Sequence, residues 1–333
     1  MTDLAADRSS AGIRPLAAWA SAYASQIGIT VAFLLLWLAF IVLAPRTFLS
    51  GNIYAAFATT TPFFALVALP LTMVIIAGDI DLSFPSIMSL GVVGFVGIWR
   101  GTGSVELGVL AALLMGSLAG LFNGVLTTFI GIPSLVVTIG TQFLFQGLTL
   151  VLVNGRSFAL VDTRTAPIYE VLVGRALGVP MQFWWLVAAS VVAWILLNRH
   201  RLGQNAYVIG DNRHAAQLMG IPIRRTRITL FVLTGLMAAF AGTLNALQIF
   251  NFYPALGSGY LLPTLAAVFI GGTSVFGGRG SIWGTFLGAF MIGGITAGIV
   301  AVGLTDYYTF LIYGAIILIS VSIHAVLQRR FAR

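Results

Sequence analysis

The chain alternates long apolar runs with short polar or charged gaps. Most of the runs approach 20 residues, which is the length an α-helix needs to cross the hydrocarbon of a bilayer. The pattern predicts an all-α, polytopic membrane protein of about ten transmembrane helices, and it indicates that runs 84–99 and 261–276 are short enough to be half-buried or kinked. The predicted spans are 27–44, 53–77, 84–99, 107–130, 133–153, 183–198, 228–250, 261–276, 282–304 and 307–327.

Composition supports membrane insertion. Of 333 residues, 59% are hydrophobic and only 8% are charged, whereas soluble domains carry about 25% charged residues. The 38 glycines exceed the usual share and suit close helix packing in lipid. Two glycine triplets with four-residue spacing predict smooth contact seams between helices. They are Gly116, Gly120, Gly124 and Gly280, Gly284, Gly288.

Missing residue types exclude several kinds of chemistry. There is no cysteine, so disulfides, iron–sulfur clusters and cysteine-ligated zinc are excluded. All 17 basic residues are arginine, and a phosphate-binding Walker A loop requires lysine. The three histidines show no metal-ligand spacing. We therefore expect a transport protein that is not an enzyme, holds no metal or cofactor, and relies on another polypeptide if ATP drives it.

The arginines lie in the gaps between apolar runs rather than on a basic face with interleaved aromatics, which argues against nucleic acid as a partner. If both termini are cytoplasmic, 12 of the 17 arginines fall on the cytoplasmic side, as the positive-inside rule favours. The predicted organisation is a cytoplasmic tail at 1–26, a transmembrane domain at 27–327 with a cytoplasmic segment at 199–227, and a cytoplasmic tail at 328–333.

Two carboxylates interrupt apolar sequence in the segment 77–86. Charges at membrane depth are costly and by default mark function, so Asp79 or Asp81 is a candidate for a proton relay or a polar substrate contact. The other interpretation is a helix start at the cytoplasmic end of a span. There Asp81 or Ser83 would accept free backbone N–H groups, and Pro85 is tolerated in the first turn.

The cytoplasmic segment 202–222 predicts a short, well-delimited helix. Asp211 or Asn212 is a suitable N-cap, Gly220 a suitable stop, and Pro222 prevents continuation. A two-turn helix is marginal alone, so it must dock on its own membrane domain or in a partner's groove. Four residues give it a small apolar surface: Ala215, Ala216, Leu218 and Met219.

A glycine-rich stretch at 268–285 predicts a sharp cytoplasmic turn between two spans. It is not a phosphate loop, because no lysine follows it and no strand precedes it. Arg279 in this turn is either a topology anchor or a phosphate-facing group, and the anchor is the favoured interpretation. The glycines expected to permit the turn are Gly271, Gly272, Gly277, Gly278 and Gly280.

Together these segments resemble the permease subunits of the ribose-type family of bacterial ABC importers, over about 52–325. The resemblance rests on G-x-I-D-L-S at Gly78–Ser83, G-x-N-x-x-A-A-x-x-x-G-I at Gly210–Ile221, and the glycine-rich run Ile270–Ala289. It implies a type II ABC importer permease in the bacterial inner membrane. The implied partners are a second permease, identical or not, ATPase subunits that bind ATP and Mg²⁺, and an extracytoplasmic solute-binding protein.

The resemblance also implies roles for particular residues. The segment Gly210–Ile221 matches the helix that couples such permeases to their ATPase. Its coupling candidates are Gly210, Asp211, Asn212, Arg213, Ala215, Ala216, Gly220 and Ile221. Candidates for the family motif and the translocation path are Gly78, Asp81, Ser83, Asn245 and Gln248. For Asn245 and Gln248, interhelical hydrogen bonds are the favoured interpretation.

The implied function is import of a sugar or sugar-like polar solute, a pentose or hexose above all. The sequence departs from the family's usual pattern at Asp79, Phe84-Pro85, 261–263 and Ala297, so the solute stays open. The alternative is a proton-coupled secondary transporter that uses Asp79 or Asp81.

Overall fold

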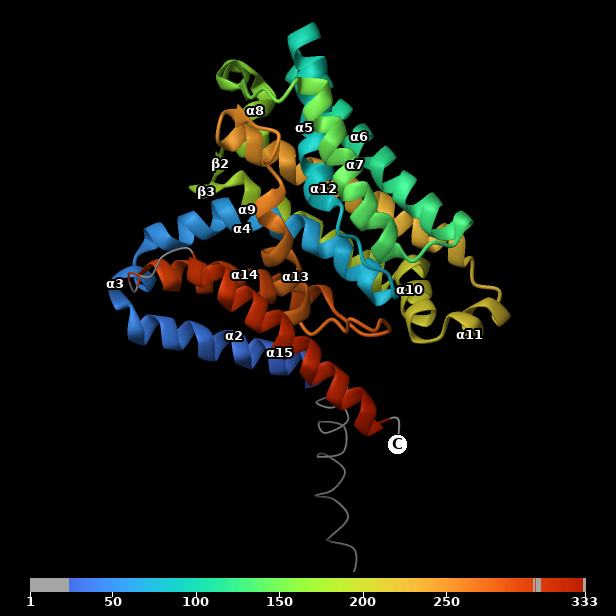
Figure 1. Cartoon of the computed structure of the whole chain (residues 1–333). Helices are drawn as coiled ribbons and strands as arrows, with labels where there is room; N and C mark the ends of the chain where they lie inside the picture. The colour runs from blue at the N-terminus through green and yellow to red at the C-terminus, as the bar shows by residue number, and fades with distance from the viewer. Residues whose placement is uncertain (1–23, 302, 304–306, 332–333) are drawn as a thin grey trace, which may run out of the picture.

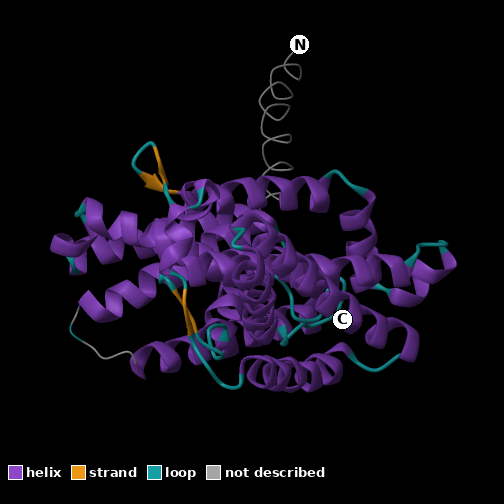
Figure 2. Cartoon of the chain, turned by 90° about the horizontal axis from the view of Figure 1, so that it is seen from above, coloured by secondary structure: helices purple, strands orange, loops and turns teal. Residues whose placement is uncertain are grey.

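The structure is a computed structural model that describes residues 24–301, 303 and 307–331. It is almost entirely helical (Figures 1 and 2). The long helices are α2 (Ala24–Leu43), α4 (Gly51–Ile76), α5 (Phe84–Thr102), α6 (Val105–Val125), α7 (Ser134–Val153), α9 (Met181–Asn198), α12 (Ile223–Gln248), α14 (Ile282–Ala301) and α15 (Tyr307–Phe331). A π-helical turn, η1 (Leu126–Ile130), extends α6.

Shorter elements join the long helices. The short helices are α3 (Pro45–Phe48), α8 (Pro167–Val173), α10 (Arg201–Asp211), α11 (Arg213–Leu218) and α13 (Leu261–Ile270), with 3-10 turns η2 (Val161–Thr165) and η3 (Ser258–Tyr260). The strands are β1 (Phe158–Ala159), β2 (Arg175–Ala176), β3 (Val179–Pro180) and β4 (Asn251–Phe252). They form two antiparallel pairs, β1 with β4 and β2 with β3, and one of the pairs projects from the edge of the helical body in Figure 2.

Within the described residues, eight helices are long and apolar enough to cross a membrane, and each coincides with a predicted span. The other two predicted spans correspond to shorter apolar helices, Ser258–Ile270 and Tyr307–Ser322. The prediction of a span through 276 is wrong, because α13 ends at Ile270, where the chain turns at Gly271 and Gly272. At 1.5 Å per residue, its 10 residues cover only about 15 Å.

The connections between spans gather at two ends of the molecule. At one end, α10 and α11 lie near the turn 271–281 and the loop 77–83 (right side of Figure 1). At the opposite end, β2, β3 and α3 lie together (left side of Figure 1). The antiparallel pair β1–β4 ties the long connection 154–180 to the segment that follows α12. This grouping agrees with the alternating direction expected of successive membrane spans.

The most enclosed helix is α4, where 89% of the residues in its most apolar stretch are buried. Pro62 and Pro70 lie inside it without ending it. Thr72 of α4 and Thr285 of α14 share a buried hydrogen bond of 2.6 Å. A helix that is apolar on all sides and surrounded by others is the centre of a bundle, and α4 has this role here.

The first predicted glycine seam is confirmed. Gly116 and Gly120 of α6 face α12. A Cβ added at Gly116 would lie 2.3 Å from the backbone oxygen of Gly235, and one added at Gly120 would lie 2.2 Å from that of Phe231. Such distances leave no room for any side chain. Backbone contact of this kind is how small residues hold helices together in lipid.

The second seam is confirmed in part. A Cβ at Gly284 would lie 2.0 Å from the oxygen of Gly271, and one at Gly288 would lie 2.3 Å from that of Ala267, so α14 packs closely on α13. Gly280 precedes α14, which begins at Ile282. It therefore belongs to the turn rather than to the helix ridge.

The predicted terminal tails fall largely outside the described residues. Only the last three residues of 1–26 are described, as the start of α2, and 332–333 are not described. Their assignment as cytoplasmic tails stays a prediction.

Candidate functional site

Three segments that are far apart in sequence, one helix and two loops, meet through glycines. Gly210 of α10 lies against the α4–α5 loop, and a Cβ there would be 1.7 Å from the oxygen of Ile76 and 2.7 Å from the nitrogen of Gly278. The Gly278 N–H donates to that same Ile76 oxygen at 2.8 Å. Gly78, Gly277 and Gly278 have positive φ of 80°, 85° and 71°, which other residues adopt only with strain. We call Gly78, Gly210, Gly277 and Gly278 the glycine junction.

The predicted short helix of the coupling segment is present. The Asn212 side chain caps α11 by accepting the Ala215 N–H at 3.0 Å, while Asp211 is the last residue of α10. Gly220, with φ of 72°, ends the helix as predicted, and the Ile221 N–H bonds back into its last turn. The segment differs from the prediction in having a second helix, α10, directly before α11.

One face of α11 is anchored and the other is free. Ala216 is fully buried, whereas Leu218 and Met219 are 77% and 70% exposed. The anchoring continues in α10, where the Tyr207 hydroxyl donates to the Gly280 carbonyl at 2.7 Å. Two large apolar side chains are therefore presented at the end of the molecule on a short, fixed helix.

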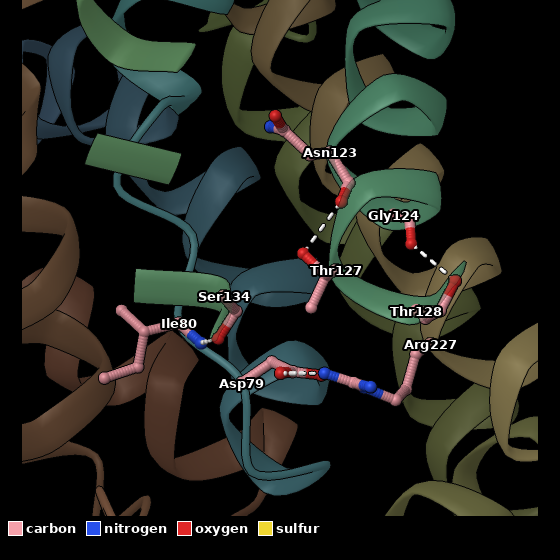
Figure 3. A network of polar contacts seen from close by, with 8 residues as sticks. All are labelled: Asp79, Ile80, Asn123, Gly124, Thr127, Thr128, Ser134 and Arg227. Carbon is pink, nitrogen blue, oxygen red and sulfur yellow. Dashed lines mark hydrogen bonds and ion pairs between the residues drawn. The ribbon is translucent and has the colours of Figure 1, made fainter. Parts of the chain in front are cut away.

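A buried ion pair lies beside this segment. Nε and one terminal nitrogen of Arg227 donate to both carboxylate oxygens of Asp79, each at 2.5 Å, and both side chains are about 5% exposed (Figure 3). Burial lowers the pKa of the Arg213 guanidinium in α11, Arg227 lowers it further, and Asp79 opposes the shift. The helix α11 is thus within electrostatic reach of the pair.

Asp81 and Ser83 form a second buried group in the same loop. One Asp81 oxygen accepts from the Ser83 N–H at 2.8 Å and from its hydroxyl at 2.7 Å. Asn123 of α6 donates to the Ser83 hydroxyl at 2.7 Å. Of the two caps predicted for α5, Ser83 is wrong, because it precedes the helix without a side-chain cap bond. Burial raises the pKa of Asp81 to about 6.

The backbone of this loop is also held from α7. The Ile80 N–H donates to the Ser134 hydroxyl at 3.1 Å, as Figure 3 shows, and the Thr138 hydroxyl donates to the Ile80 carbonyl at 3.2 Å. The loop that begins at Gly78 is therefore fixed to α6, α7 and α12 at once. The loop does lead into a helix start at Phe84, and Asp81 accepts a backbone N–H there as predicted, but both carboxylates are buried rather than solvated.

A cavity of about 870 Å³ lies among α4, α12, α13, α14 and α15. Its walls are mostly apolar, with a few polar groups that include Asn245, Tyr260, Thr61 and Thr296. Asn245 donates to the Tyr260 hydroxyl, as the interhelical interpretation predicted. The Thr61 hydroxyl has no hydrogen-bond partner among the described residues.

The five predicted path residues do not gather in one place. Only Asn245 lines this cavity. Gln248 accepts a hydrogen bond from Gln182 of α9, while Gly78, Asp81 and Ser83 belong to the loop between α4 and α5. In the described part of the chain, no group of three or more His, Cys, Asp or Glu side chains is arranged to hold a metal ion.

Comparison with known proteins decides the family. The permease family described as "Branched-chain amino acid transport system / permease component" matches residues 53–321. The chain belongs to this family. It is 33% identical to the ribose import permease protein RbsC of Escherichia coli K12 over 283 residues, which cover 84% of this chain and 87% of RbsC. No solved structure matches.

A second group of relatives transports a different solute. The chain is 30% identical to the autoinducer 2 import system permease protein LsrD of Salmonella typhi over 320 residues, covering 91% of this chain and 93% of LsrD. The protein is therefore a multi-pass, all-α permease subunit of the ribose-type ABC importers and not an enzyme. These relatives give no support to the proton-coupled alternative.

Proposed function

We propose that this permease carries a sugar or sugar-like polar solute across the bacterial inner membrane, as one half of an ATP-driven importer. Its partners would be a second permease, ATPase subunits on the cytoplasmic side and an extracytoplasmic solute-binding protein. ATP and Mg²⁺ would bind to the ATPase and not to this chain, which has no lysine for a Walker A loop.

The observation that carries the proposal is the exposed end of α11. Leu218 and Met219 are exposed apolar side chains at the last residue and the C-cap of a helix of six residues, which is anchored through the buried Ala216. A helix this short is not stable alone, and its Asn212 cap and the buried Ala216 hold it in place. Apolar anchors on a rigid helix are suited to a partner's groove, and we assign that groove to the ATPase.

The orientation follows from the arginines. The ends that gather around α10 and α11 carry most of them, and the positive-inside rule supports a cytoplasmic location for these ends. The termini would then be cytoplasmic as well, and the β-paired connection 154–180 extracytoplasmic.

The cavity among α4, α12, α13, α14 and α15 is the best candidate for the permease's share of the translocation path. Its apolar walls with few polar groups fit transient passage, because a path must not bind the solute tightly. The Asn245 amide, the Tyr260 hydroxyl and the unpaired Thr61 hydroxyl are groups that can exchange hydrogen bonds with sugar hydroxyls.

The glycine junction offers a route from the ATPase to this path. A displacement of α11 acts through α10 on two backbones in direct contact, the α4–α5 loop and the turn before α14. Both α4 and α14 line the cavity. Backbone packing without intervening side chains is stiff, so movement of one element displaces the others.

The experiment is co-purification of the permease with the ATPase subunit of its importer. Changing Leu218 and Met219 to glutamate should abolish co-purification and solute uptake, because two charges would enter an apolar interface. The matched control is Leu177→Glu, since Leu177 is 92% exposed at the opposite end of the molecule. Unchanged assembly and uptake in the double variant would refute the coupling role of α11.

A further inference from the structure

A groove of about 490 Å³ opens on the outside of the helical body between α2, α9 and α14, separate from the cavity described above. From α9 it is lined by Val187, Ser190, Val191 and Trp194, whose spacing of three, four and seven residues places them on one helix face. Ile282, Trp283 and Phe286 of α14 form the facing wall. In a membrane protein, an open apolar groove on the outer surface faces lipid chains.

The groove lies at the level of one membrane interface. It is lined from the start of α2, the last half of α9 and the start of α14, and these helix ends share the side of the molecule that carries α10 and α11. Two tryptophans, Trp194 and Trp283, are among its walls. Tryptophan is enriched where acyl chains give way to head groups.

A cation lies against Trp194, one of the residues that line the groove. The Arg199 guanidinium carbon lies 5.7 Å from the ring centroid of Trp194, so the charge is held over a wall of the groove. In the described part of the chain, no carboxylate forms a salt bridge with Arg199. Its charge is free to meet an anion at the height where phospholipid phosphates lie.

One polar group that lines the groove has no hydrogen-bond partner within the described residues. The side-chain oxygen of Gln26, which also lines the groove, is buried and accepts no hydrogen bond within the described residues. A buried carbonyl without a donor is costly. A head group that carries hydroxyl donors, such as that of phosphatidylglycerol, supplies one.

From these observations we propose that the groove binds an anionic phospholipid of the cytoplasmic leaflet. One acyl chain lies along the α9 and α14 walls, the phosphate faces Arg199, and a head-group hydroxyl donates to Gln26. The site joins α2, α9 and α14, of which α14 and α2 also share the hydrogen bond from the Trp283 indole N–H to the Thr30 hydroxyl, 3.1 Å long. The lipid would thus brace the helix that leads from the turn 271–281 into the cavity. Only the cytoplasmic orientation is taken from the proposed function.

The test is native mass spectrometry of the full-length, delipidated permease titrated with phosphatidylglycerol or phosphatidylcholine of the same acyl chains. We expect tighter binding of phosphatidylglycerol. Arg199→Gln should weaken it about fivefold, the ratio that corresponds to about 1 kcal/mol for one arginine at a charged membrane surface. Arg164→Gln removes the same charge from an exposed position at the opposite end of the molecule and should leave binding unchanged.

The apolar part of the site has its own variant. Val191→Trp fills the groove and should reduce binding of both lipids, whereas Leu118→Trp, at a similarly exposed position on α6, should not. Equal binding of the two lipids by the unaltered protein, or equal behaviour of Arg199→Gln and Arg164→Gln, would overturn the proposal. So would lipid binding that appears only after deletion of 1–23, because the groove would then belong to that segment of the chain.

Discussion

The buried pair between Asp79 and Arg227 offers the sharpest quantitative prediction. Asp79→Asn removes the negative partner while leaving an amide of nearly the same size, so Arg227 keeps its charge in a site that is about 5% exposed. One terminal nitrogen of Arg227 already has no acceptor among the described residues. A guanidinium cannot lose its proton in a protein, and the positive Arg213 lies within its electrostatic reach.

The expected magnitude follows from burial. Removing one member of a buried pair costs about 3–5 kcal/mol, because the other charge stays desolvated. Arg227→Gln should cost less than Asp79→Asn, since a lone carboxylate can take up a proton and become neutral. The double variant Asp79→Asn with Arg227→Gln buries no charge, so its cost should fall short of the sum of the two single costs by about 2 kcal/mol or more.

The assay is reversible unfolding of the purified permease in mixed micelles, at neutral pH, for the wild type, both single variants and the double variant. Charged groups on the surface do not give such values, because exposed pairs contribute about 1 kcal/mol or less. A cost below 1 kcal/mol for Asp79→Asn, or single costs that simply add in the double variant, would refute the reasoning from a buried and coupled pair.

Three further predictions concern the same region. Gly210→Ala places a Cβ 1.7 Å from a backbone oxygen, so we expect the ATPase still to bind while solute uptake falls tenfold or more. The control is Gly97→Ala, where a Cβ would meet no atom within 4 Å. Normal uptake by Gly210→Ala would contradict the role of the glycine junction. Asn212→Ala removes the cap of α11 at a cost of about 1 kcal/mol, which should weaken ATPase binding roughly fivefold in a titration; unchanged affinity would show that the cap does not matter. Burial raises the pKa of Asp81 from 3.8 to about 6, so the folded protein holds the proton more tightly than the unfolded chain does. The stability gained from this protonation is complete below about pH 4 and is lost as the pH rises through about 6. We expect wild-type stability to fall by about 3 kcal/mol over that range, and Asp81→Asn, measured by unfolding at both ends of it, to lack this fall while uptake continues.

The sequence predicted local features well where the physical cause is local. Asn212 and Gly220 delimit α11 because a cap and a left-handed stop depend on neighbouring backbone groups alone. The turn predicted from Gly271 and Gly272 is present, but the predicted span ran through it to 276, whereas α13 ends at Ile270. Apolar residues continue past them, and hydropathy does not register a turn.

The partners of polar groups could not be predicted. Asp79 and Arg227 are 148 residues apart. The sequence pattern indicated a proton relay or a polar substrate contact for Asp79 and only a place among the cytoplasmic arginines for Arg227. The only available signal was an acidic and a basic residue, both at the same predicted end of their spans. Likewise, the division of the predicted path residues between the cavity and the α4–α5 loop depends on helix rotations that a sequence pattern does not specify.

By itself, the sequence determined the membrane-spanning class, the order of the helices and the need for an external ATPase. These properties follow from apolar run length and missing residue types, which act locally or through composition. Only the tertiary structure decided that Gly78, Gly210, Gly277 and Gly278 meet, that Asp79 is neutralised by Arg227, and which face of α11 is free. Those outcomes depend on how whole helices pack, and close packing is a property of the assembled bundle rather than of any one segment.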